Sequence, residues 1–172
     1  MNSRPLMTVL AGTNGAGKST ITSVFLQHLY LGEVIDADAI AKEINPASPE
    51  KANWAAGREV IKRVEKCIHT QRGFSVETTL AGGNAVRQMQ TAKNHGFEIT
   101  LYYVALSDVE LHVSRVATRV QASGHSIPEQ VIRNRYARSG LSIVLCKLFC
   151  QAPRRSIASH HLHAISTMYV AG

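Results

Sequence analysis

The chain has 172 residues, of which 45% are hydrophobic and 18% are charged, which suits one globular domain and excludes a disordered or fibrous protein. It contains no run of 18 apolar residues and no apolar leader segment at its start, so we expect a cytoplasmic protein without membrane spans. The net charge of +7 arises near the C-terminus, because no acidic residue follows Glu129. This distribution argues against a basic nucleic-acid-binding face across the whole domain.

Predicted strands and helices alternate along the chain. In chain order they are a strand at 6–11, a helix at 18–30, a strand at 33–36, a helix from 48 to 73, a strand at 74–77, a helix at 84–95, a strand at 97–106, a helix from 108 to a break at 123–124, and a helix that starts at 126–129. This order predicts an α/β fold with a parallel sheet and helices on both faces. Ligands of such folds bind beyond the carboxyl ends of the strands.

Residues 12–19 match the pattern G-x-x-x-x-G-K-S/T in full, between a predicted strand and a predicted helix. Its glycines let backbone N–H groups turn toward phosphate oxygens, and the helix start adds the positive end of a dipole. In this motif Lys18 reaches the β- and γ-phosphates, and Ser19 supplies a hydroxyl to Mg²⁺. We therefore predict a phosphate-binding loop (P-loop) for ATP, or alternatively GTP, with Mg²⁺. The expected nucleotide-binding residues are Gly12, Thr13, Asn14, Gly15, Ala16, Gly17, Lys18, Ser19 and Thr20.

Acidic residues follow two of the predicted strands. Asp36 and Asp38 come after the second strand, and Glu77 ends the third, just before Thr79. One carboxylate there could contact Mg²⁺ or its water shell, and another could accept a proton from an attacking hydroxyl. Alternatively, Asp38 caps a helix that begins at Ala39, and Glu77 caps the segment after its strand. No apolar run ends in Asp-Glu, which favours a small-molecule kinase over a motor or switch protein.

Arginines flank the turn that separates the last two predicted helices. They are Arg115, Arg119, Arg133, Arg135 and Arg138. A helical hairpin that carries arginines resembles a lid that closes over phosphates, because the planar guanidinium group stabilises phosphoryl charge. Alternatively, each arginine belongs to a solvated helix face. His125 lies in the turn without an acidic partner, and we interpret it as structural.

Four segments of the chain resemble the zeta toxin family of P-loop kinases, and in particular its compact members. They are residues 12–20, 35–41, 74–80 and 102–138. Many families share the phosphate loop, whereas the pattern R-V-x-x-R-V-x-x-x-G-H-x-I-P in the last segment is far more specific. The likeness covers residues 5 to about 140.

The resemblance implies a P-loop NTPase-type fold with a helical lid, and an ATP-dependent kinase whose acceptor is an alcohol group. Toxin members of the family phosphorylate UDP-N-acetylglucosamine, and they are paired with an antitoxin. It implies that Asp38 activates the sugar hydroxyl and that Glu77, with Thr79 beside it, binds the substrate. The assigned residues are catalytic Asp38, Lys18 and Arg119, substrate-binding Asp36, Glu77 and Thr79, and nucleotide-binding Arg115 together with Arg133 or Arg135, in addition to the loop itself.

The last part of the chain departs from this pattern. We divide the chain into a kinase domain, residues 1–140, and an atypical basic tail, residues 141–172, which lacks the acidic strand of the family. We expect the tail to replace the family's C-terminus, to lack strongly periodic structure and to pack poorly on the sheet. An ordinary basic helix and a metal site from Cys146, Cys150 and nearby histidines are the alternatives. Two other functions stay open: a nucleotide-binding module without catalysis, and a nucleic-acid-binding protein that uses the tail.

Overall fold

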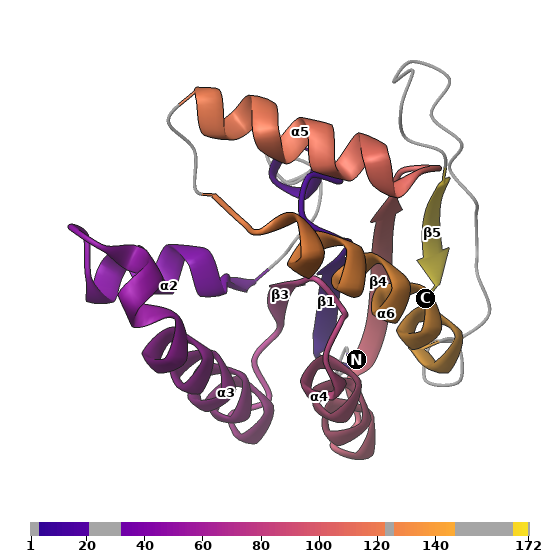
Figure 1. The fold of residues 1–172 in the computed structure, drawn as a ribbon. Coiled ribbons are helices and arrows are strands. Elements are labelled where there is room, and N and C mark those ends of the chain that lie inside the picture. The colour runs from indigo at the N-terminus through magenta and orange to yellow at the C-terminus, as the bar shows by residue number, and fades with distance from the viewer. Residues whose placement is uncertain (1–3, 21–31, 123–125, 147–166, 172) are drawn as a thin grey trace.

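The computed structural model describes residues 4–20, 32–122, 126–146 and 167–171 (Figure 1). Its elements are β1 (Leu6–Ala11), β2 (Glu33–Ile35), α2 (Ala37–Ile44), the 3-10 helix η1 (Pro49–Ala52), α3 (Asn53–His69), β3 (Phe74–Thr78), α4 (Gly83–Asn94), β4 (Glu98–Ala105), α5 (Val109–Gln121), α6 (Glu129–Cys146) and β5 (Thr167–Ala171). A further helix begins at Lys18, directly after the phosphate loop, and the rest of the helix predicted there lies outside the described residues.

The strands form one sheet in the order β2-β3-β1-β4-β5. Strands β1 to β4 are parallel, and β1 lies in the middle, with Leu10 opposite both Glu77 of β3 and Tyr102 of β4. The carboxyl ends of β1, β2 and β3 therefore meet at one edge of the sheet. The phosphate loop, Asp36 and Glu77 all lie at this edge. The predicted α/β fold and the parallel order of these strands are confirmed.

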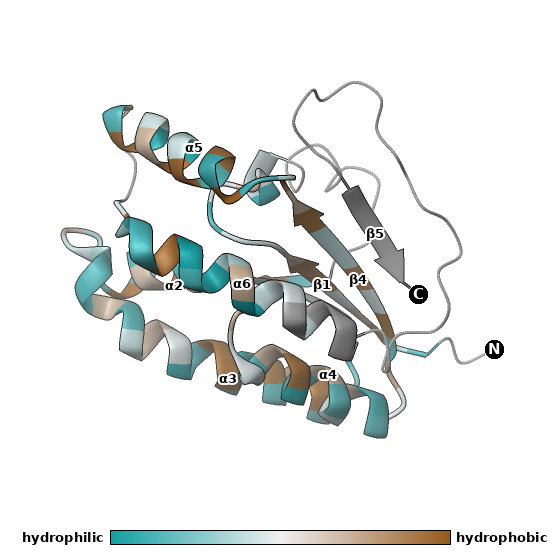
Figure 2. Cartoon of the chain, turned by 45° about the vertical axis from the view of Figure 1, so that its right-hand side comes forward, coloured by the Kyte–Doolittle hydropathy of each residue, from teal (hydrophilic) through white to brown (hydrophobic). Residues whose placement is uncertain are grey.

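Apolar side chains between the sheet and its helices form the core. Helices α3, α4 and α6 lie along the same side of the sheet (Figures 1 and 2). Phe74, Ile68, Met89 and Leu101 are fully buried there. Figure 2 shows hydrophobic strands and helices of mixed character, as expected for helices that cover a sheet with one face. The prediction of helices on both faces depends partly on the helix predicted at 18–30, of which the structure describes only residues 18–20.

Helices α2 and α3 differ from the prediction. Helix α2 occupies Ala37–Ile44, where the predicted chain order has no element and the capping alternative places a helix that begins at Ala39. Helix α3 ends at His69, four residues before the predicted stop at Gly73. It ends early because Gln71 adopts a left-handed backbone conformation, with φ of 52°, and its side chain donates a hydrogen bond to the carbonyl of Ile68.

The tail is better integrated than predicted. Helix α6 continues past residue 140 to Cys146, and residues 167–171 form β5, which pairs antiparallel with β4 over five registered positions. The expectation that the tail packs poorly on the sheet is therefore wrong for β5. Its sequence, Thr-Met-Tyr-Val-Ala, is rich in residues that favour strands. The proposed metal ligands after Cys146 lie outside the described residues.

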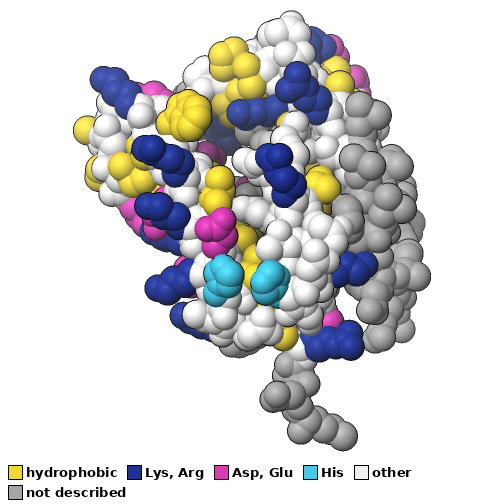
Figure 3. Space-filling model, turned by 90° about the horizontal axis from the view of Figure 1, so that it is seen from below, with side chains coloured by type: hydrophobic (Ala, Val, Ile, Leu, Met, Phe, Trp, Pro, Cys, Tyr) yellow, Lys and Arg dark blue, Asp and Glu magenta, His cyan; other side chains and the backbone are white. Residues whose placement is uncertain are grey.

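Basic side chains are dispersed over the surface that Figure 3 displays. Lys and Arg side chains there are separated by uncharged surface and by carboxylates. The basic residues of the tail, Lys147, Arg154 and Arg155, lie outside the described residues. The nucleic-acid-binding alternative, which uses the tail, is therefore not tested by this surface and stays a prediction.

Candidate active site

Three glycines shape the phosphate loop. Gly12, Gly15 and Gly17 have φ values of 151°, 78° and 95°, which L side chains rarely adopt. A Cβ on Gly12 would lie 2.3 Å from the carbonyl oxygen of Val104, and one on Gly15 would lie 2.6 Å from that of His112. Backbone conformation and close packing thus both require glycine at these two positions.

Lys18 lies at the centre of the candidate site. Its Nζ donates a hydrogen bond of 2.7 Å to the carbonyl oxygen of Gly12 and lies 3.8 Å from Oε1 of Glu77. The Lys18 and Glu77 side chains are only 9% and 19% exposed. Glu77 is part of β3 and its carboxylate faces Lys18, so the alternative in which it caps the following segment is wrong. The hydroxyl of Thr78 instead accepts a hydrogen bond from the N–H of Leu80.

Burial perturbs both members of this ion pair. It lowers the pKa of the Lys18 ammonium, while the carboxylates of Glu77, Asp38 and Asp36 act in the opposite direction. Burial also raises the pKa of the Glu77 carboxyl, against the effect of the Lys18 charge. Perturbed ionisable groups in a cavity are a common feature of active sites.

The two aspartates after β2 have different environments. Asp36 is the N-cap of α2, because its Oδ1 accepts a hydrogen bond of 3.1 Å from the N–H of Asp38. Asp38 lies in the first turn of the helix and is exposed. The alternative in which Asp38 caps this helix is therefore wrong, and its carboxylate remains available for chemistry.

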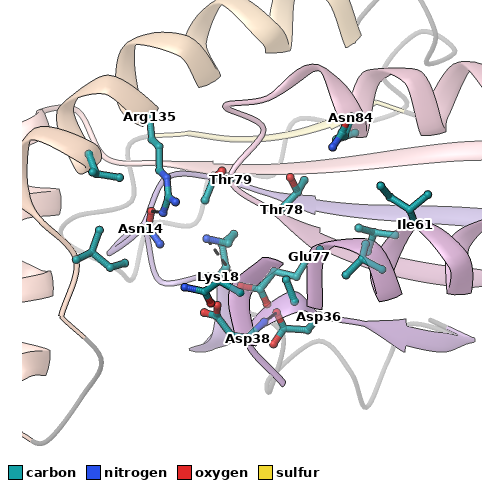
Figure 4. A pocket seen from close by; sticks show the side chains of 18 of the residues that line it. Asn14, Lys18, Asp36, Asp38, Ile61, Glu77, Thr78, Thr79, Asn84 and Arg135 are labelled. Atoms are coloured by element: carbon teal, nitrogen blue, oxygen red, sulfur yellow. Dashed lines mark hydrogen bonds and ion pairs between the residues drawn. The ribbon is translucent and has the colours of Figure 1, made fainter. Parts of the chain in front are cut away.

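A cavity of about 540 Å³ opens beside Lys18 (Figure 4). Figure 4 shows Asp36, Asp38 and Glu77 gathered around Lys18, and Arg135 extending toward Asn14. Apolar, carboxamide and hydroxyl side chains line the rest of the wall. The lining residues outside the loop are Asp36, Ala37, Asp38, Asn53, Gly57, Val60, Ile61, Val76, Glu77, Thr78, Thr79, Asn84, Ala85, Gln88, Ser126, Ile127, Pro128, Val131 and Arg135. The phosphate loop and the acidic groups thus line one cavity, and Thr79 is part of it.

The predicted lid arginines divide into two groups. Nη1 of Arg135 donates a hydrogen bond of 2.8 Å to Oδ1 of Asn14 in the phosphate loop. Arg133 instead binds Glu110 and Glu129 with its whole guanidinium group and does not line the cavity. The prediction left Arg133 and Arg135 as alternatives, and this geometry favours Arg135, because Arg133 is held by two carboxylates outside the cavity.

Arg115 and Arg119 are exposed on α5, on the other side of the loop. Nη1 of Arg115 lies 3.7 Å from the position that a Cβ on Gly17 would take. The charge of Arg119 is close enough to contribute to the lowered pKa of Lys18. Arg138 lines a neighbouring cavity of about 370 Å³ that shares Arg135 and Thr79 with the first one. His125 lies outside the described residues.

Helices α5 and α6 hold the phosphate loop through buried polar contacts that the sequence analysis missed. His112 is fully buried; its Nδ1 donates a hydrogen bond of 2.9 Å to the carbonyl oxygen of Asn14, and its Nε2 accepts one of 3.4 Å from the N–H of Leu106. These partners assign the neutral tautomer with the proton on Nδ1. Burial lowers the pKa of His112, with the charges of Lys18 and Arg115 acting in the same direction.

A second buried contact joins the loop to α6. The hydroxyl of Ser139 donates to the carbonyl of Tyr136 and accepts from the hydroxyls of Thr13, at 3.1 Å, and Tyr103, at 2.9 Å. The loop is therefore fixed to the helix that also carries Arg135. In the sequence, only a serine or histidine at a position where the helical pattern expects a buried apolar residue could have indicated Ser139 and His112.

This fold and this cavity define a P-loop nucleotide-binding protein with the architecture of kinases. The sequence model of the zeta toxin family matches residues 1–161, and the chain belongs to that family. The match extends beyond residue 140, so the expectation that the likeness stops there is wrong. Helix α6, which runs through this point without interruption, accounts for part of the extension.

A protein of Haemophilus influenzae (strain ATCC 51907 / DSM 11121 / KW20 / Rd), described as uncharacterized, is 40% identical over 125 residues, which are 73% of this chain and 88% of that protein. A structure of the Pnkp1/Rnl/Hen1 RNA repair complex contains a similar chain, with a TM-score of 0.63 and 16% identity. The similarity covers 84% of this chain and 47% of that chain, so this protein spans about half the length of its counterpart.

Two bacterial structures are similar over most of their length. The first comes from the PezAT chromosomal toxin-antitoxin system of Streptococcus pneumoniae, with a TM-score of 0.52 and 15% identity over 86% of this chain and 88% of that chain. The second is shikimate kinase from Acinetobacter baumannii in complex with shikimate, with a TM-score of 0.50 and 20% identity over 82% and 80%. At these identities the likeness shows the fold alone. Family and fold together support a nucleotide-binding phosphotransferase.

Among the residues that the structure describes, no helix combines the length and apolar character needed to cross a bilayer.

Proposed function

We propose that this protein is an ATP-dependent kinase that transfers the γ-phosphoryl group to a hydroxyl of a small molecule, with a nucleotide sugar such as UDP-N-acetylglucosamine as the acceptor. One observation carries the proposal. The cavity joins the phosphate loop, through Asn14 and Lys18, to a wall that bears Asp36, Asp38 and Glu77. A phosphoryl donor on the loop and a hydroxyl in the cavity would therefore meet beside carboxylates.

In this proposal Asp38 is the general base. Its carboxylate is not engaged as the helix cap, and it shares the cavity with Lys18. The acceptor oxygen would form a bond to the γ-phosphorus while the bond from that phosphorus to the β–γ bridging oxygen breaks and ADP leaves. The hydroxyl proton would pass to the Asp38 carboxylate. Such positioned proton transfer contributes about a hundredfold or more to a rate.

Cationic side chains would stabilise the charge of the transferring group. Lys18 is the loop cation, and Arg135 approaches the loop from α6. Arg119, from α5, is the third cation in this proposal, since its charge already acts on Lys18. Fixed planar guanidinium donors suit phosphoryl oxygens because they bind two of them at once. Glu77 and Thr79 would bind the acceptor.

The donor set suits Mg²⁺. Ser19 lies in the first turn of the helix that follows the loop, where its hydroxyl could serve as a ligand. The described residues contain no group of three or more His, Cys, Asp or Glu side chains that could hold a metal on its own. Mg²⁺ fits such a site because it keeps several waters and takes few protein oxygens besides the phosphates. When bound, it would neutralise charge on the β- and γ-phosphates.

A screen of phosphoryl acceptors tests the proposal. Wild-type protein with MgATP is incubated with a set of nucleotide sugars, UDP-N-acetylglucosamine first, and with small alcohols that include shikimate. Phosphorylated product is measured by mass spectrometry. We expect a product with a nucleotide sugar and none with the Lys18→Ala variant. ATP binding without transfer to any acceptor would favour the alternative of a nucleotide-binding module without catalysis.

An antitoxin protein is a further part of the proposal. Its support is family membership and the fold shared with the PezAT structure, which comes from a toxin-antitoxin system. Expression of the wild-type chain alone should then arrest growth of a bacterial host, whereas the Asp38→Asn variant should not. Normal growth with active wild-type protein would contradict a toxin role without affecting the kinase assignment.

A further inference from the structure

One wall of the cavity is a face of helix α3. Asn53, Gly57, Val60 and Ile61 line the cavity, and their spacing of four, three and one residues places them on one side of the helix. Along the helix, Gly57 lies between Asn53 and the pair Val60 and Ile61. The helix backbone itself therefore forms part of the cavity surface.

Neither backbone conformation nor packing against the described residues requires glycine at position 57. Gly57 lies inside a 17-residue helix, where glycine costs about 0.5–1 kcal/mol relative to alanine. It is absent from the residues with positive φ, and a Cβ built on it meets no described atom within 4 Å. Gly12 and Gly15 differ on both counts, since each has a positive φ and a carbonyl oxygen within 3 Å of the added Cβ.

The space in front of Gly57 belongs to the cavity. Since Gly57 lines it, a side chain there would extend into the volume that the acceptor needs. The neighbouring wall is uncharged: Val60 and Ile61 are apolar, and Asn53, Asn84 and Gln88 carry carboxamides. The charged residues that line the cavity are Asp36, Asp38, Glu77, Lys18 and Arg135.

We propose that Gly57, which is exposed and lines the cavity, determines acceptor specificity, because its missing side chain lets an uncharged ring with hydroxyl or amide groups lie directly against the backbone of α3. A pyranose ring has this chemistry: its flat face would contact the helix, and its hydroxyl or amide groups would reach the carboxamides. The proposal rests on the proposed kinase function and deepens it. It also explains why a helix-breaking residue lies inside α3.

Gly140 provides a matched control. It also lies inside a helix, α6, with no positive φ, and a Cβ on it meets no described atom within 4 Å. Unlike Gly57, it does not line either cavity. The two glycines therefore share the cost in helix propensity and differ in their relation to the acceptor.

The test compares Gly57→Ala and Gly57→Leu with Gly140→Ala and Gly140→Leu. All four variants should melt at or above the wild-type temperature, by about 1–4 °C for alanine, since each gains helix propensity. With UDP-N-acetylglucosamine as the probe, or whichever acceptor the screen finds, kcat/KM should fall about tenfold or more for Gly57→Leu, and less for Gly57→Ala. The Gly140 variants, which lie outside both cavities, should keep acceptor use and slow ATP hydrolysis within about twofold of wild type.

The outcomes separate the two proposals. Higher stability together with weaker use of the acceptor, in the Gly57 variants only, would support the specificity role, because a merely structural glycine could not give both. An unchanged kcat/KM for the acceptor in Gly57→Leu would overturn it, as would a lower melting temperature in Gly57→Ala. If the wild-type protein phosphorylates no acceptor, the proposed function fails, and the Gly57 proposal fails with it.

Discussion

The phosphate loop and the rest of the cavity meet at Lys18, but they are built in different ways. The loop is fixed from three directions: its own glycines, His112 of α5, and Ser139 and Arg135 of α6. The rest of the cavity wall instead combines side chains from α2, α3, β3, α4, α6 and the segment before α6. The difference indicates that buried contacts fix the phosphate loop, whereas individual side chains from several elements set the shape of the remaining cavity.

The largest expected effect comes from removing Lys18, the cation of the phosphate loop, and concerns stabilisation by MgATP. MgATP at about a hundred times its dissociation constant should stabilise wild-type protein by roughly 2.7 kcal/mol. Lys18→Ala should lose most of this gain, because it removes the charge that faces the β- and γ-phosphates. Thermal melts with and without MgATP measure this stabilisation in each protein. Lys42→Ala, on the exposed side of α2 and outside the cavity, is the control. An equal shift in wild type and Lys18→Ala would refute a phosphate role for the loop.

A smaller effect is expected where the loop meets α6. Ser139→Ala removes the acceptor of two buried hydroxyls, those of Thr13 and Tyr103, and should cost about 1–3 kcal/mol of unfolding free energy. Urea denaturation provides the measurement. Ser114→Ala, an exposed serine of α5, should change stability by less than about 0.5 kcal/mol. Equal stability of the two variants would mean that this contact does not hold the loop.

The smallest effect concerns His112 and pH. Because burial holds its pKa below the unfolded value, the unfolded chain binds more protons than the native protein just below pH 6.5. Stability should therefore fall as the pH drops below 6.5, with a slope of at most about 1.4 kcal/mol per pH unit from this group. Protonation would direct a second N–H of the ring at the N–H of Leu106, while Lys18 and Arg115 repel the new charge and Asp108 attracts it.

His112→Asn should flatten this part of the stability profile while its amide keeps a donor for the carbonyl of Asn14. Denaturation midpoints between pH 5 and pH 7 measure the slope. An identical slope in wild type and variant would show that His112 does not titrate with unfolding.

The two regions also differ in how well the sequence predicts them. The phosphate loop is a contiguous motif between a strand and a helix, and its position is as predicted. Asp38, Glu77 and Thr79 follow strand ends, and the parallel sheet brings them into one cavity as expected. Spacing could not separate the two aspartates, because either one can cap a helix that begins after it.

Contacts between distant residues account for what the sequence analysis missed. Arg133 and Arg135 are both on α6, and only the position of Glu110 on another helix determines that Arg133 turns away from the cavity. His112 and Ser139 contact loop residues that are 98 and 126 positions away. Strand β5 pairs with β4 across a long stretch of chain whose composition gave little periodic signal.

The proposed function requires that the cavity bring an acceptor hydroxyl to Asp38 beside the phosphate loop. The direct test measures two quantities in Asp38→Asn: the rate at which phosphorylated acceptor forms, and the affinity for MgATP. Glu43→Gln, an exposed acid of the same helix outside the cavity, is the matched control. We predict that Asp38→Asn loses about a hundredfold or more in turnover while MgATP affinity and stability stay near wild type. Wild-type turnover in Asp38→Asn, or an equal loss in Glu43→Gln, would contradict the account.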